Sequence, residues 1–155
     1  MKIAVGSDHR GYHAKEIVKS IVTQMGHEFV DMGAGSSHPI DYPDTAYLVA
    51  TAVSRHEADR GVLICSTGIG MCIAANKISG IRAALCHDEF TASVSREHND
   101  SNVLCLAADQ SGEVALRKMV EAWLTTGFSG GRHERRVKKI GTIEQGGDPR
   151  QCTEC

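Results

Sequence analysis

The sequence is poor in the features that mark nucleic-acid-binding and membrane proteins. Aromatic residues make up only 5% of the 155 residues, which argues against a stacking platform for bases. The formal net charge of −2 argues against a surface dedicated to nucleic acid or anionic lipid. No segment approaches the roughly 20 apolar residues that span a bilayer, and no apolar stretch with a cleavage site follows Met1. We therefore expect a soluble, cytoplasmic protein with no nucleic-acid or membrane partner.

What the sequence does contain suits a single globular domain. Hydrophobic residues make up 41% and charged residues 23%, and the chain is long enough for one core. We expect one domain over residues 1–145 and a disordered tail over 146–155. The six cysteines are expected to be mostly reduced thiols. The C-x-x-C spacing of Cys152 and Cys155 has no second pair and is weak evidence for a metal or redox site.

Short apolar runs alternate with amphipathic stretches along the chain. The run Val62 to Cys65 has no polar alternation, as expected for a strand that is covered on both faces. In the stretch 112–125, Val114, Leu116 and Met119 contribute to a helical pattern. The repeated alternation predicts an α/β fold, with a five-stranded parallel sheet and helices on both faces. The expected strands are residues 2–6, 28–31, 62–65, 81–85 and 102–106, and the expected helices are 11–25, about 44–56, 70–77, 88–97, 112–125 and a short one ending near Ile143.

The carboxyl ends of the strands are where a ligand is expected in such a fold. Asp8 and His9 follow the first expected strand, so this polar pair is well placed to touch a ligand. The alternative is that Ser7 or Asp8 caps the following helix. Both interpretations remain open from the sequence.

The loop Cys65 to Gly70 follows the third expected strand and leads into a helix. Its glycines let the backbone approach a ligand closely, and amide groups at a helix start favour negative charge, such as an enediolate oxyanion. The same surroundings favour the thiolate form of Cys65, which can act as a general base. The alternative is a buried strand residue followed by a turn.

Other functions of this loop are less consistent with its residues. Ile73 stands where a dinucleotide fingerprint has its third glycine, and the loop follows the third strand instead of the first, so a nicotinamide cofactor is not expected. The Gly-Lys-Ser/Thr ending of a nucleoside-triphosphate loop is absent. A cysteine-protease site would need an oriented His, and nothing local provides one.

Two further groups lie later in the chain. His98 and Asn99 come between a helix and the fifth expected strand, where a His also simply complements a helix dipole. Arg132, Arg135 and Arg136 form a basic cluster, and arginine forks suit phosphate. The alternative for this cluster is a solvated helix face.

Taken together, these motifs resemble the type B ribose-5-phosphate isomerases and the related galactose-6-phosphate isomerases. The resemblance runs from residue 2 to about residue 145, and the tail lies outside it. It rests on Gly6-Ser7-Asp8-His9, Asp41-Tyr42-Pro43-Asp44, Cys65 to Gly70 with Ala74-Ala75-Asn76-Lys77, Gly80-Ile81-Arg82-Ala83, Ser95 to Val103 and Gly130-Gly131-Arg132-His133.

The resemblance implies a Rossmann-like three-layer sandwich whose C-terminal helix packs on a partner subunit, in a homodimer or dimer of dimers with shared active sites. It implies an aldose–ketose isomerase of carbohydrate metabolism, in the pentose phosphate pathway, that interconverts ribose 5-phosphate and ribulose 5-phosphate through a cis-enediolate, without metal or organic cofactor. Cys65 matches the family's catalytic base. A branch of the family uses a Glu on the following helix, but Met71 stands at that position here.

The resemblance also implies roles for other residues. Thr67 would stabilise the enediolate together with the loop amides, and His98 would protonate the ring oxygen during ring opening. His98, Arg132 and Arg136 would reach the site from the other subunit. The implied substrate-binding residues are Asp8, His9, Tyr42, Ser66, Gly68, Ile69, Gly70, Asn99, Asp109, Arg132 and Arg136.

One position departs from the family's pattern. Members commonly place an Arg shortly after the fifth strand as a phosphate ligand, and Asp109 stands there in this chain. A carboxylate repels phosphate unless it turns away, and we consider Arg135 as a compensating charge. Two alternatives follow: the same chemistry on a tetrose, allose or galactose phosphate, or a sugar-phosphate-binding protein without catalysis.

Overall fold

The computed structural model of the chain describes residues 1–152 and contains one parallel sheet of five strands. The strands lie in the order β2-β1-β3-β5-β4, and every neighbouring pair is parallel. This arrangement confirms the predicted α/β fold. The strands are β1 (Lys2–Ser7), β2 (Glu28–Asp31), β3 (Arg60–Cys65), β4 (Ala83–Leu85) and β5 (Val103–Ala107).

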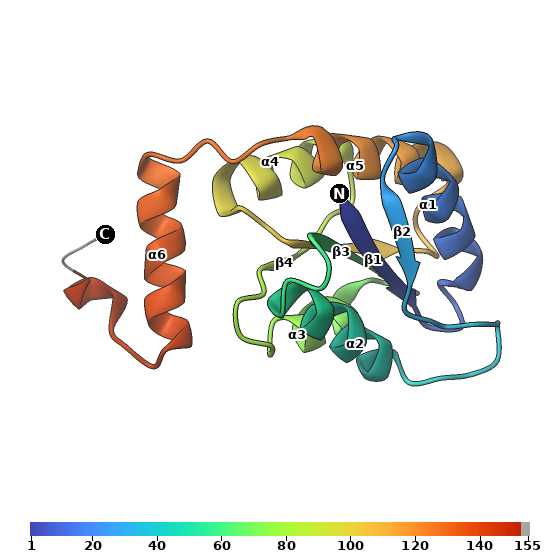
Figure 1. Cartoon of the computed structure of the whole chain (residues 1–155), viewed down its shortest axis with the longest axis horizontal. Helices are drawn as coiled ribbons and strands as arrows, with labels where there is room; N and C mark the ends of the chain where they lie inside the picture. The colour runs from blue at the N-terminus through green and yellow to red at the C-terminus, as the bar shows by residue number, and fades with distance from the viewer. Residues whose placement is uncertain (153–155) are drawn as a thin grey trace.

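Helices cover both faces of the sheet and make it the middle of three layers (Figure 1). The helices α1, α4 and α5 lie on one face, and α2 and α3 lie on the other. The bounds are α1 (Tyr12–Gln24), α2 (Tyr42–Ser54), α3 (Ile69–Ala75), α4 (Glu89–Asn99), α5 (Glu113–Thr125) and α6 (Arg132–Glu144), with a short 3-10 helix η1 (Pro149–Gln151).

Alternate residues of each central strand enter two separate hydrophobic cores. In β3, Val62 and Ile64 pack under α1, α4 and α5, whereas Leu63 and Cys65 pack under α2 and α3. The strand is therefore apolar throughout, because both of its faces are buried. One apolar residue of the helical pattern faces outward, since Val114 in the first turn of α5 is 71% exposed.

The sheet topology brings three loops together at one edge. The chain moves outward from β1 in one direction to β2 and in the other direction to β3, so the order of strands switches between β1 and β3. The register pairs Ser7 with Ile64 and Cys65 with Ala107, so these strands end side by side. The loops after β1, β3 and β5 therefore meet at the carboxyl edge, where ligands of such sheets bind.

Helix α4 carries the chain back to the opposite edge. It begins after β4 and ends at Asn99, and the backbone of Asn102 then accepts a hydrogen bond from the amide of Gly61 at the start of β3. Cys65 lies four residue steps after Gly61 along β3, a distance of about 13 Å at about 3.3 Å per residue. The turn after α4 therefore lies at the amino edge of the sheet, away from Cys65.

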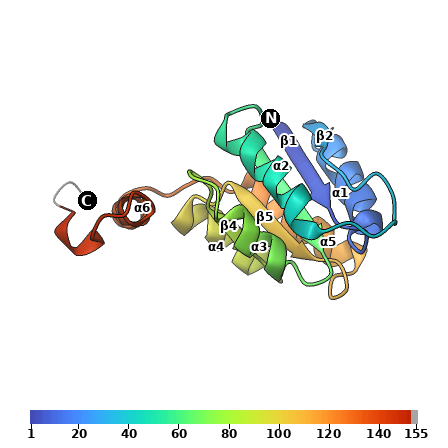
Figure 2. The same ribbon diagram turned by 90° about the horizontal axis from the view of Figure 1, so that it is seen from below.

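The last helix, α6, stands apart from the three layers (Figures 1 and 2). Its contacts are with α4 and η1, and Ile140 and Ile143 on it are 43% and 58% exposed. The side chain of Glu144 accepts a hydrogen bond from the amide of Gly80 at 2.7 Å, which ties the end of α6 to the loop before β4. The packing of α6 on a partner subunit remains a prediction.

The predicted disordered tail over residues 146–155 includes 153–155, which lie outside the described residues. Within the described part, η1 is tied to α6 by a 2.9 Å hydrogen bond from Lys139 Nζ to the carbonyl of Pro149. None of the helices in residues 1–152 combines the length and the apolar character that crossing a bilayer requires.

Candidate active site

Most of the predicted site residues gather at the carboxyl edge of the sheet. Backbone hydrogen bonds join the three loops there: the amide of Asp8 donates to Ile64 at 3.1 Å, and the amide of Asp109 donates to Ser66 at 3.1 Å. These bonds place the Asp8-His9 pair and Asp109 beside the loop that begins at Cys65. We refer to this group as the thiol half-site: Asp8, His9, Tyr42, Cys65 to Gly70 and Asp109.

Cys65 lies at the end of β3 and is 5% exposed. Its Sγ accepts a hydrogen bond from the amide of Gly68 at 3.1 Å, so the loop folds back over the sulfur. An amide donor of this kind stabilises a thiolate. Met71, at the position of the alternative base, is fully buried in the core beneath α3. Because its side chain has no carboxylate, α3 offers no alternative base at that position.

Glycines set the shape of the loop. Gly68 has a φ of 74°, and a Cβ on it would lie 2.5 Å from Leu85 Cδ1. A side chain at this position is therefore excluded by both backbone strain and space. A Cβ on Gly70 would lie 2.7 Å from the Tyr42 ring, so the ring closes over the start of α3.

Not all of the expected oxyanion donors are available. The amide of Gly68 already donates to Cys65, and the amide of Ile69 donates to Thr67 Oγ1 at 3.3 Å. Within residues 1–152, no hydrogen bond engages the amides of Thr67 and Gly70. No hydrogen bond in these residues engages the amide of Ser66 either, so three N–H groups and the Thr67 hydroxyl are the remaining donors for a developing negative charge.

Asp8 and His9 both contact neighbouring loops. Oδ1 of Asp8, a side chain in a residue only 6% exposed, accepts hydrogen bonds from the amides of Arg10 and Gly11 at 2.9 Å each, so this carboxylate closes the turn before α1. His9 Nδ1 accepts from the amide of Ile40 at 3.4 Å. His9 also lines a hollow of about 400 Å³ together with Pro39, Ile40, Asp41 and Asp44.

Asp109 is paired with a residue that sequence reasoning missed. Its Oδ2 accepts hydrogen bonds from Ser66 Oγ at 2.6 Å and from Arg10 Nη2 at 2.6 Å and Nε at 3.2 Å. The Ser66 hydroxyl, followed by the Arg10 guanidinium, holds the pKa of the Asp109 carboxyl below its usual range. The sequence did offer a signal for this partner, because Arg10 directly follows Asp8-His9. Arg135, the residue expected to compensate the charge of Asp109, lies on α6 instead.

The remaining predicted residues form a second group at the amino edge. His98 stacks on His133, with ring centroids 4.0 Å apart and planes 7° apart, and Arg132 Nε donates to His133 Nε2 at 3.3 Å. Burial lowers the pKa of His133, and the charges of His98, Arg132 and Arg136 lower it further. We refer to this group as the arginine half-site: His98, Asn99, Arg132, His133 and Arg136.

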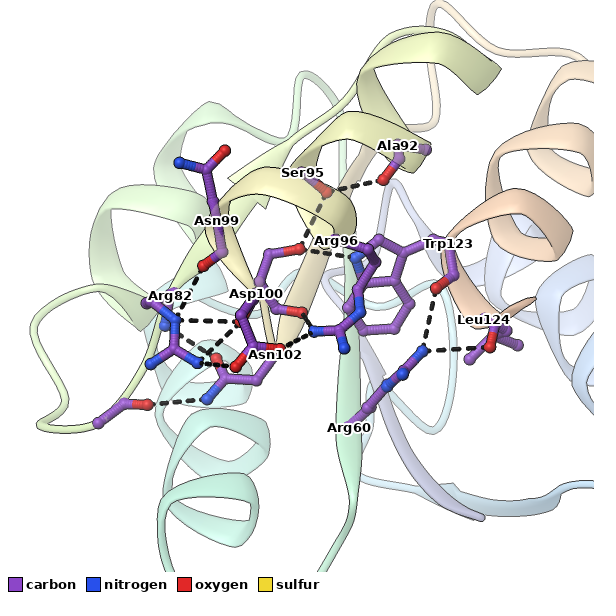
Figure 3. A network of polar contacts seen from close by, with 12 residues as sticks. Arg60, Arg82, Ala92, Ser95, Arg96, Asn99, Asp100, Asn102, Trp123 and Leu124 are labelled. Atoms are coloured by element: carbon purple, nitrogen blue, oxygen red, sulfur yellow. Dashed lines mark hydrogen bonds and ion pairs between the residues drawn. The ribbon is translucent and has the colours of Figure 1, made fainter. Parts of the chain in front are cut away.

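A polar network supports the end of α4, which carries His98 and Asn99 (Figure 3). The Arg82 guanidinium donates to the carbonyls of Asn99 and Asp100 at 3.0 Å or less and to Asp100 Oδ2 at 2.8 Å. Arg96 binds Asp100 Oδ1 at 2.9 Å and also donates to the carbonyl of Ser101. Asp100 has a left-handed φ of 47°, so these contacts fix an unusual backbone conformation immediately after α4.

Trp123 of α5 packs against this network (Figure 3). Its ring is fully buried, and its Nε1 donates to Ser101 Oγ at 2.8 Å. The guanidinium groups of Arg60 and Arg96 lie 5.3 and 6.0 Å from the ring centroid. Burial, followed by the charge of Arg96, lowers the pKa of Arg60 to about 10.

One chain therefore holds two half-sites at opposite edges of its sheet. The thiol half-site contains the candidate base and hydroxyl groups, and the arginine half-site contains the candidate acid and phosphate ligands. In the part of the chain that the structure describes, no group of three or more His, Cys, Asp or Glu side chains is arranged to hold a metal ion.

Comparison with known proteins gives consistent matches over nearly the whole chain. Residues 3–140 match the family described as Ribose/Galactose Isomerase. The chain is 47% identical over 146 residues to a Bacillus subtilis protein named putative sugar phosphate isomerase YwlF, covering 94% of this chain and 98% of that protein. It is 45% identical to ribose-5-phosphate isomerase B of Escherichia coli, covering 93% and 97%.

Solved structures agree with these matches. A ribose-5-phosphate isomerase B from Clostridium thermocellum superposes with a TM-score of 0.93 at 46% identity, over 94% of this chain and 99% of that chain. The enzyme of Mycoplasma genitalium, solved with bound ribulose-5-phosphate, superposes with a TM-score of 0.88 at 41% identity, over 92% and 95%.

Proposed function

The chain belongs to the ribose/galactose isomerase family, and from this premise we propose that it interconverts ribose 5-phosphate and ribulose 5-phosphate. Three of the four relatives described above are named ribose-5-phosphate isomerase B, and one of these was solved with ribulose-5-phosphate. The observation that carries the proposal in this chain is the Cys65 sulfur, which accepts a hydrogen bond from the Gly68 amide in a loop with three unengaged amides and a hydroxyl.

The proposed reaction moves one hydrogen between two carbons of the open-chain sugar. The Cys65 thiolate takes the proton from C2, the electron pair forms the C1=C2 bond, and negative charge develops on O1. Thr67 and the amide of Gly70 donate hydrogen bonds to this cis-enediolate. Cys65 then returns the proton to C1, while O1 gains a proton and O2 loses one to give the ketose. No metal or organic cofactor takes part.

The proposal requires two copies of the chain. Because the arginine half-site lies at the amino edge, His98 and Arg132 would meet the Cys65 of a second copy in a homodimer, or in a dimer of dimers. His98 would protonate the ring oxygen during ring opening, Asn99 would bind a hydroxyl, and Arg132 and Arg136 would bind phosphate. The exposed Ile140 and Ile143 of α6 suit contact with such a partner.

The cytoplasm is the proposed location, in carbohydrate metabolism. Cys65, Cys72, Cys86 and Cys105 are free thiols, which suits a reducing compartment.

The proposal is tested by measuring ketose formation from ribose 5-phosphate and from a panel of erythrose 4-phosphate, allose 6-phosphate and galactose 6-phosphate. We expect the highest kcat/KM with ribose 5-phosphate, because this ratio expresses specificity. The rate should be unchanged in EDTA. A higher kcat/KM for another sugar phosphate would change the substrate, and no turnover with any of them would contradict an isomerase.

A further inference from the structure

Arg10 extends from the loop after β1 across the carboxyl edge to Asp109 in the loop after β5. Its Nη2 lies 2.6 Å and its Nε 3.2 Å from the same carboxylate oxygen, although the two residues are 99 positions apart in the chain. The bond joins loops that come together only in the folded sheet.

Arg10 is anchored at its backbone and at its guanidinium. The backbone amide of Arg10 donates to Asp8 Oδ1 at 2.9 Å, which fixes the start of the side chain. At the other end, Asp109 Oδ2 also accepts from Ser66 Oγ at 2.6 Å, and Ser66 directly follows Cys65. Arg10 is therefore oriented relative to the loop that carries the candidate base.

One edge of the guanidinium remains open. Within residues 1–152, Nη1 of Arg10 makes no hydrogen bond, and the side chain is 56% exposed. A guanidinium that is anchored through Nε and Nη2 still presents N–H groups to an anion, and its planar fork suits phosphate. An exposed ion pair contributes little to the free energy of unfolding. A role in binding a ligand can therefore be tested by substitution with little loss of stability.

We propose that Arg10 binds the phosphate group of the substrate from the thiol half-site, with Asp109 and Ser66 as positioning residues. The Asp109 carboxylate then does not face the phosphate unshielded, because the guanidinium stands against it. This inference rests on the proposed function, since it names a group that holds the phosphate of the sugar phosphate. It places one phosphate ligand on the same chain as Cys65, opposite Arg132 and Arg136 of the second copy.

The first test replaces Arg10 by Gln. We expect the KM for ribose 5-phosphate and the Kd for inorganic phosphate, measured by titration calorimetry, each to rise by about tenfold or more, since a charge-assisted hydrogen bond is lost. The kcat should change much less, because Arg10 is remote from the transferred proton. The matched control is Arg117→Gln, which removes a partly exposed arginine paired with Glu121 on α5 and should leave both constants unchanged.

The second test separates binding from positioning through the variants Asp109→Asn and Arg10→Gln/Asp109→Asn. Asp109→Asn alone should raise KM by less than Arg10→Gln does, because the guanidinium loses its anchor but keeps its charge. In the double variant, the loss of Asp109 should raise KM no further, because it has no arginine left to position. Two independent increases that multiply would contradict the positioning role of Asp109.

The outcomes distinguish this inference from the proposed function. If wild type isomerises ribose 5-phosphate and Arg10→Gln has the same KM and the same phosphate Kd, Arg10 is not a ligand and only this inference fails. If wild type isomerises no sugar phosphate but Arg10→Gln still weakens phosphate binding about tenfold, the anion site stands and the proposed reaction fails. An unchanged phosphate Kd in an inactive protein overturns both.

Discussion

The two edges of the sheet hold their functional side chains by different means. At the carboxyl edge, short-range bonds to the backbone fix Cys65 and Asp8, and glycines leave no space for other side chains. At the amino edge, the side chains of Arg82 and Arg96 fix the turn at Asp100, and stacked imidazole rings join α4 to α6, which extends beyond the sheet. The first edge holds the candidate base within close-packed backbone, whereas the second exposes the side chains of Arg132 and Arg136.

This difference suits two different tasks, proton transfer at the carboxyl edge and phosphate binding at the amino edge. A base needs a position fixed to a few tenths of an ångström, which backbone bonds in a close-packed loop provide. Phosphate ligands tolerate longer side chains, because a guanidinium reaches its anion through several rotatable bonds. Each prediction below tests one of the two edges.

The largest expected effect is at the carboxyl edge. Replacing Cys65 by Ala should lower kcat for ribose 5-phosphate by about a thousandfold, because the general base is removed. Inorganic phosphate should bind as before, because the arginines remain. Stopped assays for ketose and titration calorimetry measure the two quantities.

The matched control is Cys72→Ala. Cys72 is the rival base, because its hydrogen bond with Cys105 contributes most to lowering the pKa of its thiol to about 7. Its Sγ, however, donates to the carbonyl of Ala83 at 3.4 Å and serves the packing of α3. We expect Cys72→Ala to retain most of the activity. The reverse pattern, with Cys65→Ala active and Cys72→Ala inactive, would assign the base to Cys72.

The next effect is at the amino edge and concerns stability. Replacing Asp100 by Ala leaves Arg96, which is 7% exposed, without its carboxylate and removes a residue that tolerates the left-handed conformation. We expect the free energy of unfolding to fall by about 2–4 kcal/mol in urea denaturation. The exposed pair Lys138–Glu134 gives the control, and Lys138→Ala should cost less than about 1 kcal/mol. Equal effects of the two substitutions would show that the network has no special role.

The smallest effect is a dependence of stability on pH at the amino edge. The folded pKa of His133 lies below its ordinary value, chiefly because of burial. As the pH falls through about 6.5, the unfolded chain takes up a proton at this residue before the folded chain does. The free energy of unfolding should therefore decrease as the pH falls and increase as it rises.

Urea denaturation at pH 8 and pH 5.5 measures this slope. We expect His133→Gln to have a shallower slope than wild type, whereas His38→Gln, in an exposed loop, should keep the wild-type slope. An unchanged slope in His133→Gln would mean that other groups cause the pH dependence.

Much of the fold follows from local patterns in the sequence. Every expected strand and helix is present, because apolar runs and helical spacing report directly on burial at both faces of the sheet. The observed boundaries of the helices and strands differ from the expected ones by a few residues, because residues at the helix ends determine where a helix begins. Helix α2, expected to begin near residue 44, begins at Tyr42, since Pro43 suits the first turn of a helix.

The features that the sequence did not reveal depend on distant residues. Arg10 and Asp109 pair across 99 positions, so neither residue alone indicated the bond. The stacking of His98 on His133 likewise joins α4 to α6, two helices whose contact the local patterns do not indicate. The roles of the individual site residues stay predictions, which the variants above test.

The central claim is that one active site combines the thiol half-site of one copy with the arginine half-site of another. It is tested most directly by mixing Cys65→Ala with Arg132→Gln/Arg136→Gln, each poorly active alone, after reversible dissociation. In a two-fold dimer, about half of the mixed dimers are heterodimers with one intact site out of two, so about a quarter of wild-type activity should return. Native mass spectrometry verifies that heterodimers form. Heterodimers without recovered activity would contradict the shared site.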